Sequence, residues 1–233
     1  MTENHNSESD RQLSHYGFFR FNDLYWQEEE KSRRKFLQQF ADALPELAER
    51  VHLYRIYPTR PDIDLMVWSA LRIGDPTSVA DFFVRFGSIT APWRKYLKPM
   101  DTLWGFTRPS TYSTGKSAQE LDPFTKTKKP YLIVYPFSKT AEWYLMSREA
   151  RQGMMNEHIR IGRQYPEICQ LLLYSTGLQD QEFVVVYETE SLAHFSELVT
   201  SLRDTEGRKY TLRDTPIYTA TYSPLGEVVS EWS

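Results

Sequence analysis

The sequence predicts an α+β fold made of two ferredoxin-like halves. Strand-like and helix-like segments follow the order β-α-β-β-α-β in residues 15–109, and the same order recurs in residues 130–233. Apolar residues alternate in the strands and recur at helical spacing in the helices. A polar connector, residues 110–129, separates the halves. We therefore expect two antiparallel sheets, each with helices on one face, that form a duplicated, dimeric-α+β-barrel-type subunit.

The N-terminal half follows a polar lead-in, residues 1–14, whose composition predicts disorder. Proline-containing and polar stretches separate its segments. The expected strands are YGFFRFN (16–22), VHLYRIYP (51–58), DIDLMVWSAL (62–71) and DTLWGFTRP (101–109), and the expected helices cover 28–50 and 77–89.

Polar stretches also separate the segments of the C-terminal half. Ser147 is the predicted N-cap of its first helix, because a serine oxygen there accepts a hydrogen bond from the first turn. The expected strands cover 130–137, 167–175 and 182–189, the expected helices 147–165 and 191–203, and extended chain 208–223 ends the half.

Composition excludes several classes of function. The chain has 233 residues and a formal net charge of -3, which gives no electrostatic case for binding nucleic acid or an anionic membrane. Cys169 is the single cysteine, which excludes an internal disulfide framework and a multi-cysteine zinc site. The N-terminus lacks the apolar core of a secretory signal, and no apolar run is long enough to span a bilayer. A cytoplasmic protein is expected.

A histidine lies at the centre of an apolar helical stripe in the C-terminal half. Steps of four, four, three and four residues place Ala150, Met154, His158, Ile161 and Tyr165 on one face. By itself, such a histidine is more often a core residue than a ligand. His5 and His15 are expected in or beside the lead-in, and His52 and His194 as structural or solvated residues.

Three further polar side chains are expected to surround the same space as His158. Gln170 shares an otherwise apolar strand face with Leu172, so its amide needs a partner or a ligand. Tyr135 lies on an alternating strand, and Glu206 falls one turn after Leu202 on the buried stripe of the last helix. From the residues alone, Tyr135 is better explained as a core strand tyrosine, and Glu206 has the alternative explanation of a solvated helix-end residue.

Four blocks in the C-terminal half resemble the chlorite dismutase / coproheme decarboxylase superfamily. They are YPFSKTAEWY, MMNEH, LLLYSTGLQDQEFVVVYET and LRDTEGRKYTLRDTP, in the family's order. The N-terminal half resembles the family in architecture only. The resemblance implies an iron porphyrin held by His158 as proximal ligand, with Glu206 as the hydrogen-bond partner of that histidine. It also implies a homo-oligomer, commonly a pentamer.

Two positions separate the activities within this superfamily. Chlorite-degrading members carry a distal arginine where this chain has Gln170, and an aliphatic residue where it has Tyr135. A neutral amide supplies no fixed cation for chlorite. Coproheme decarboxylases carry a tyrosine before the proline, as in this chain, and Lys139 matches their propionate-contacting lysine. Both positions favour decarboxylation over chlorite chemistry.

The resemblance therefore implies a peroxide-dependent haem synthase. Iron coproporphyrin III (coproheme) is the substrate, haem b the product and hydrogen peroxide the oxidant, with a radical on Tyr135. Gln170 orients peroxide, Lys139 and Tyr112 hold propionates, and Trp143 lines the macrocycle. The alternatives are a chlorite-degrading enzyme and a non-catalytic haem-binding protein. A third alternative is an unrelated α+β protein in which His158 is only a core residue.

Overall fold

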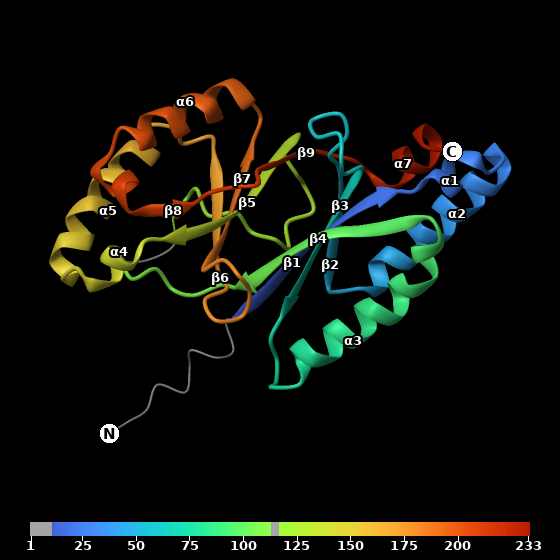
Figure 1. Ribbon diagram of the computed structural model, residues 1–233, viewed down its shortest axis with the longest axis horizontal. Helices are drawn as coiled ribbons and strands as arrows, with labels where there is room; N and C mark the ends of the chain where they lie inside the picture. The colour runs from blue at the N-terminus through green and yellow to red at the C-terminus, as the bar shows by residue number, and fades with distance from the viewer. Residues whose placement is uncertain (1–10, 113–116) are drawn as a thin grey trace. The chain divides into compact units, whose positions relative to one another are not determined.

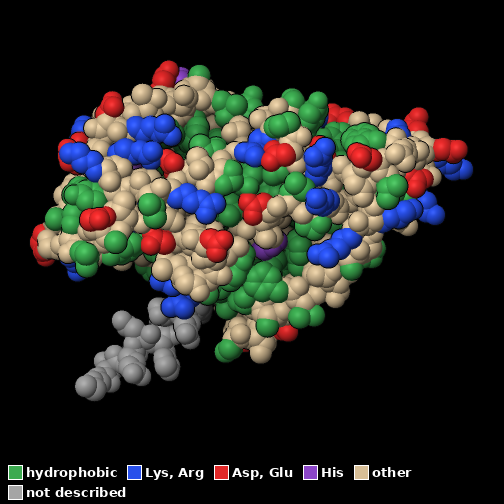
Figure 2. Space-filling view, viewed as in Figure 1, with side chains coloured by type: hydrophobic (Ala, Val, Ile, Leu, Met, Phe, Trp, Pro, Cys, Tyr) green, Lys and Arg blue, Asp and Glu red, His purple; other side chains and the backbone are tan. Residues whose placement is uncertain are grey.

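The computed structural model describes residues 11–112 and 117–233. The described chain divides into two compact units: unit 1 contains residues 11–107 and 220–233, and unit 2 contains residues 108–112 and 117–219 (Figure 1). Among the described residues, none of the helices is long and apolar enough to cross a membrane. On the face drawn in Figure 2, acidic and basic side chains are interspersed with hydrophobic ones.

Unit 1 is an antiparallel sheet in the order β4-β1-β3-β2-β9, with helices packed on one face. Asn22 caps α1 by accepting a hydrogen bond from the Tyr25 backbone N–H at 3.1 Å. Its elements are β1 (Gln12–Phe21), α1 (Asp23–Gln27), α2 (Glu30–Ala43), η2 (Leu44–Glu46), β2 (Arg50–Arg55), β3 (Leu65–Arg72), α3 (Ser78–Thr90), η3 (Ala91–Lys95), β4 (Leu97–Phe106), β9 (Tyr218–Tyr222) and α7 (Leu225–Glu231).

The core of unit 1 is filled with large side chains. On α2, Leu37, Phe40 and Ala41 are buried at spacings of three and one, the apolar stripe of an amphipathic helix. Close packing also explains Gly17 on β1, where a Cβ atom would lie only 3.0 Å from the Phe19 ring and 3.4 Å from that of Phe86. The sheet and helices of this unit therefore meet without space for a ligand at these positions.

Within unit 2, the strands pair antiparallel in the order β6-β7-β5-β8. Helices α5 and α6, yellow and orange in Figure 1, contact each other. Side chains from both helices pack with the β5 and β7 side chains that share one sheet face. Its elements are β5 (Tyr131–Lys139), α4 (Ala141–Leu145), α5 (Arg148–Gly162), β6 (Cys169–Tyr174), β7 (Phe183–Thr189), α6 (Leu192–Arg203), η4 (Glu206–Tyr210) and β8 (Thr211–Arg213).

The α+β fold with antiparallel sheets is confirmed, and both units show the predicted element order. Three expectations about the ends are wrong. The first strand begins at Gln12, inside the predicted lead-in, of which residues 1–10 lie outside the described residues. The chain after residue 223 forms α7, and residues 220–233 belong to unit 1, where Val228 is buried in its core. The predicted first helix, 28–50, ends early: α2 stops at Ala43, η2 follows, and β2 already begins at Arg50, while the separate helix α1 precedes the predicted range.

Candidate functional site

Helix α5 places the candidate ligand His158. Ser147 caps the helix as predicted, accepting a hydrogen bond from the Ala150 backbone N–H at 3.2 Å. His158 is half-buried, and Ile161, three residues later, is buried at 9% exposure in a cluster with side chains of β5, β7 and α6. The predicted stripe therefore faces the sheet, except at its first member, Ala150, which is exposed.

Burial keeps the His158 imidazole neutral. It lowers the pKa of His158 from 6.5 to about 4, and the nearby Lys139 ammonium lowers it further in the same direction. At neutral pH the ring therefore carries a free lone pair, which is the form that binds iron. Within the part of the chain that the structure describes, the His158 side chain makes no hydrogen bond to protein that would occupy that lone pair.

Lys139 is the last residue of β5 and lies beside Trp143 and Arg208, a group that we call the Lys139 corner. The Lys139 Nζ lies 4.3 Å from the centre of the Trp143 ring and 3.4 Å from the carbonyl oxygen of Gly207. Burial, and then the nearby Arg208, lower the pKa of Lys139 to about 8, while Glu182 acts in the opposite direction. The corner thus offers two neighbouring cations, a suitable arrangement for binding carboxylates.

Tyr135 lies on the helix-facing side of β5 and is paired with a tyrosine that sequence reasoning did not single out. Its ring stacks on that of Tyr187 with 6.3 Å between centroids and an interplanar angle of 26°. Burial, then the charge of Tyr187 and a hydrogen bond between the two hydroxyls, raise the pKa of Tyr135 well above its usual value. Tyr135 is consequently a protonated phenol at neutral pH.

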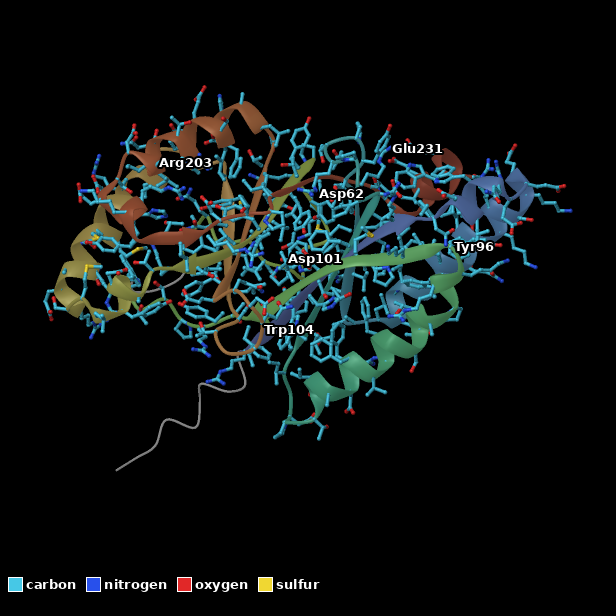
Figure 3. The ribbon with its side chains drawn as sticks, in the orientation of Figure 1. Asp62, Tyr96, Asp101, Trp104, Arg203 and Glu231 are labelled. Atoms are coloured by element: carbon cyan, nitrogen blue, oxygen red, sulfur yellow. The ribbon has the colours of Figure 1, made fainter. Side chains whose placement is uncertain are left out.

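A charged cluster lies within electrostatic reach of Tyr135. Arg208 forms a salt bridge with Asp214 at 2.6 Å, and Arg203 approaches the same carboxylate at 3.7 Å. Arg203 is the last residue of α6 (Figure 3). Asp214 raises and Arg203 lowers the pKa of Tyr135, as smaller effects than its burial. None of these three residues was expected from sequence, because their meeting depends on how β8 and η4 return to the sheet.

The sheet face that carries Tyr135 is only partly covered. Cross-strand pairing places Ile133 opposite Tyr187 and Tyr135 opposite Val185, and Gln170 of β6 is opposite Tyr187 from the other side. Ile133 and Tyr187 are buried, whereas Tyr135 and Val185 are half-buried and Gln170 is exposed. A strip of this face is therefore accessible where α5 carries His158.

Apolar exposure on this strip fits a flat ligand. Leu172, two residues after Gln170 on the same face, is 43% exposed. Gly162 is the last residue of α5, and a Cβ atom placed there would meet nothing within 4 Å. Packing of a strand against Gly162 is therefore not the reason for this glycine, and space remains beside the helix.

Gln170 has a well-defined backbone and an unoccupied side chain. Its N–H donates to the carbonyl oxygen of Gln119 at 2.7 Å, and its own carbonyl accepts from the N–H of Leu121 at 2.9 Å. These bonds attach the predicted connector to β6. Among the described residues, the Gln170 amide makes no hydrogen bond to protein, so it is available to a ligand on the helix-facing side.

Glu206 does not occupy the predicted position. Helix α6 ends at Arg203, so Glu206 begins η4 rather than continuing the buried stripe of α6. Its exposed carboxylate forms a salt bridge with Lys209 at 2.7 Å. The Glu206 backbone N–H donates to the Glu157 carboxylate at 3.4 Å, which brings η4 beside the residue that precedes His158. The expectation of a buried Glu206 was wrong because helical spacing was carried past a helix end.

A cavity of about 970 Å³ lies on a neighbouring face of α5. Tyr112 lines it, and the Tyr112 carbonyl accepts a hydrogen bond from the Gln152 amide at 3.0 Å. His158, Tyr135, Lys139, Trp143 and Gln170 do not line this cavity. The structure thus brings Lys139, Trp143 and His158 together and places Tyr112 on an adjacent, arginine-rich surface.

The residues around His158 fit an iron porphyrin. In the described part of the chain, no group of three or more His, Cys, Asp or Glu side chains is placed to hold a metal ion. A porphyrin brings four nitrogen ligands of its own, and one neutral imidazole is sufficient as the protein ligand. The partly exposed apolar strip suits the macrocycle, and the Lys139 corner suits its carboxylates.

Known proteins resemble this chain in sequence and in fold. It is 27% identical to a coproheme decarboxylase of Mycolicibacterium smegmatis over 172 residues, covering 72% of this chain and 70% of the relative. It is 25% identical to a chlorite dismutase of Ideonella dechloratans over 191 residues, covering 78% of this chain and 65% of the relative.

The fold matches that of a chlorite dismutase from Candidatus Nitrospira defluvii, solved in complex with imidazole. The TM-score is 0.84 at 23% identity, over 97% of this chain and 96% of the other. The sequence pattern of the family described as chlorite dismutase matches residues 27–223. The chain therefore belongs to the chlorite dismutase family, whose known members among these relatives are haem-related enzymes.

Proposed function

We propose that this protein oxidatively decarboxylates iron coproporphyrin III to haem b with hydrogen peroxide. The observation that carries the proposal is the convergence of a neutral His158, the Lys139 ammonium beside it and a protonated Tyr135 on the same strand as Lys139. The similarity to a coproheme decarboxylase supports the same reaction. The porphyrin is the substrate and supplies the redox chemistry when bound.

The reaction balances for each propionate. A propionate and one hydrogen peroxide, with one proton, give a vinyl group, carbon dioxide and two water molecules. The propionate loses two electrons, and the peroxide gains them. Two such steps convert iron coproporphyrin III to haem b, so two molecules of peroxide are consumed.

The residues of this chain have separate tasks in the proposed reaction. His158 holds the substrate iron through its neutral ring. Lys139 and Arg208 bind carboxylates at the corner of the sheet, and positioning of this kind supplies much of an enzymatic rate. Gln170 orients peroxide by hydrogen bonding through its unoccupied amide.

Tyr135 is the proposed radical residue. Because burial raises its pKa, it remains a phenol and gives up an electron together with its proton. This is the first of the two electrons that reduce the peroxide. The resulting radical then takes a hydrogen atom from the propionate side chain, which restores the phenol. The carbon radical left on the propionate gives up the second electron, and loss of carbon dioxide completes the vinyl group.

The test follows the porphyrin by mass spectrometry. Apo-protein is mixed with iron coproporphyrin III, and peroxide is titrated in. We expect two successive losses of a carboxyl group and one hydrogen in the wild type. Tyr135→Phe is expected to bind coproheme with the wild-type spectrum but to lose at least about a hundredfold in decarboxylation rate, about 2.7 kcal/mol in the barrier.

Tyr165→Phe is the matched control. Tyr165 belongs to the same cluster as Tyr135 and its hydroxyl contacts Ser201 at 3.4 Å. It should retain the wild-type rate. Equal rates for Tyr135→Phe and the wild type would remove Tyr135 from its role, and bleaching without decarboxylation would refute the proposed reaction. Chlorite added to the haem-loaded protein should release no dioxygen; its release would favour the chlorite-degrading alternative.

A further inference from the structure

The cavity on α5 is lined by an unusual concentration of positive charge. We call it the arginine pocket, and it has a volume of about 970 Å³. Four arginines of α5 and its C-cap line it, together with amide and hydroxyl groups. The arginines are Arg148, Arg151, Arg160 and Arg163.

These arginines lack carboxylate partners within the structure. Among the described residues, none of the four forms a salt bridge within 4.0 Å, although other arginines of the chain do. The Nε of Arg151 is buried and has no hydrogen-bond partner. Buried donors are normally satisfied, so this unpaired Nε–H adds to the uncompensated positive charge of the cavity wall.

The position of Arg148 also disfavours a purely structural explanation. It is the first residue of α5, where the positive end of the helix dipole disfavours a cation. Arg160 and Arg163 at the other end are favourable for the helix. The helix dipole therefore does not explain the positions of all four arginines, whereas their shared place on the cavity wall does.

The concave shape fits a small molecule with several acidic groups. Pockets of this volume usually bind compact ligands, whereas flat basic surfaces bind macromolecules. Asn156, which also lines the pocket, adds an amide donor, whereas the Gln152 Nε2 already donates to Asn156 Oδ1 at 2.8 Å and to the Tyr112 carbonyl at 3.0 Å. Guanidinium groups bind carboxylates in a bidentate manner, and four of them suit a polycarboxylate.

We propose that the arginine pocket is a second binding site for porphyrin carboxylates. This inference rests on the proposed function. Iron coproporphyrin III carries four carboxylates and haem b carries two, so the pocket attracts the substrate more strongly than the product. Substrate bound there contacts the same helix that carries His158. Each decarboxylation removes one carboxylate and so weakens the attraction between the porphyrin and the arginines. The pocket thereby favours loading of substrate over rebinding of product.

The test uses metal-free porphyrins, which need no iron ligand. The affinity of the full-length protein for coproporphyrin III, with four carboxylates, is compared with that for mesoporphyrin IX, with two, by fluorescence anisotropy. We expect the wild type to prefer coproporphyrin III by at least about tenfold, about 1.4 kcal/mol. The preference should weaken as salt is raised, and it should persist in His158→Ala.

Three double variants separate the pocket from general charge effects. Arg151→Gln/Arg163→Gln should reduce the preference with an unchanged unfolding midpoint, and what preference remains is that of the Lys139 corner. Arg34→Gln/Arg94→Gln removes the same charge from unit 1 and should retain the preference. Arg151→Lys/Arg163→Lys should restore part of it. An unchanged preference in the pocket variant, or an equal loss in the unit 1 control, would overturn the inference.

The two proposals fail in distinguishable ways. If iron coproporphyrin III is decarboxylated but the pocket variant keeps its preference for four carboxylates, only the inference about the pocket fails. If the preference depends on Arg151 and Arg163 but peroxide causes no decarboxylation, the proposed reaction fails and the pocket remains a porphyrin-carboxylate site.

Discussion

The two units have the same element order but fill the space between sheet and helices differently. In unit 1, β1 and α3 enclose His15, which is 3% exposed and lies with its ring centroid 4.6 Å from that of Phe86 and 5.5 Å from that of Phe82. In unit 2, His158 is half-buried beside Lys139 and faces a partly covered strip of sheet. One unit is therefore a closed core, and the other keeps space for a ligand.

The two histidines show why burial alone does not identify a ligand. Burial lowers the pKa of both from 6.5 to about 4. The His15 ring, however, is surrounded by phenylalanines, whereas His158 lies near a lysine and an open apolar strip. The surroundings of the ring, rather than its protonation state, separate a core histidine from a candidate ligand.

The largest expected effect on porphyrin binding comes from exchanging the histidines for alanine. His158→Ala should weaken coproheme binding by at least about a hundredfold, about 2.7 kcal/mol, because the iron loses its protein ligand. Added imidazole should restore the absorption spectrum. His15→Ala should instead lower the free energy of unfolding by about 2–4 kcal/mol through a core cavity and leave the affinity of the folded protein unchanged. Unchanged binding in His158→Ala would contradict the assignment.

A pair of leucines tests whether the strip in unit 2 is truly unpacked. Leu37 of α2 is fully buried, so Leu37→Ala should lower the free energy of unfolding by about 3–5 kcal/mol. Leu172 is 43% exposed, so Leu172→Ala should lower the free energy of unfolding of the apo-protein by less than about 1 kcal/mol. Leu172→Ala should nevertheless weaken coproheme binding. Urea unfolding and a porphyrin titration measure both effects, and equal destabilisation would show that the strip is packed.

The pH dependence of the Michaelis constant tests the Lys139 corner. Burial lowers the pKa of Lys139 to about 8, so its ammonium is charged below that pH and is lost as pH rises through it. A carboxylate ligand prefers the charged form, so KM for coproheme should rise by up to about tenfold between pH 7 and 9. Lys139→Arg should flatten this rise. A full rise in Lys139→Gln would assign it to another group.

The smallest effect is expected at Glu206. Its carboxylate is paired with Lys209 in solvent, so Glu206→Gln should change the free energy of unfolding by less than about 1 kcal/mol. The iron–histidine stretching frequency of the ferrous complex, measured by resonance Raman spectroscopy, should stay unchanged. A downshift would mean that Glu206 leaves Lys209 and bonds His158 when the porphyrin is bound.

Strand alternation, helix capping and helical periodicity determined from the sequence which side of its element each candidate site residue faces. Strand alternation placed Tyr135 and Gln170 on helix-facing positions, and the Ser147 cap with helical periodicity placed His158 toward the sheet. These predictions succeeded because neighbouring residues of a strand or helix fix which side a residue faces. The quoted motifs also carried the family resemblance, which the match over residues 27–223 confirms.

Only the tertiary structure decided which distant residues meet. The stacking of Tyr187 on Tyr135 requires the register between β5 and β7, and the burial of His15 requires α3 to pack on β1. Likewise, the end of α6 at Arg203 moved Glu206 away from the buried stripe, and α7 returned the end of the chain to unit 1. Strand register, helix ends and chain return depend on packing between segments far apart in sequence, which periodicity within one segment does not contain.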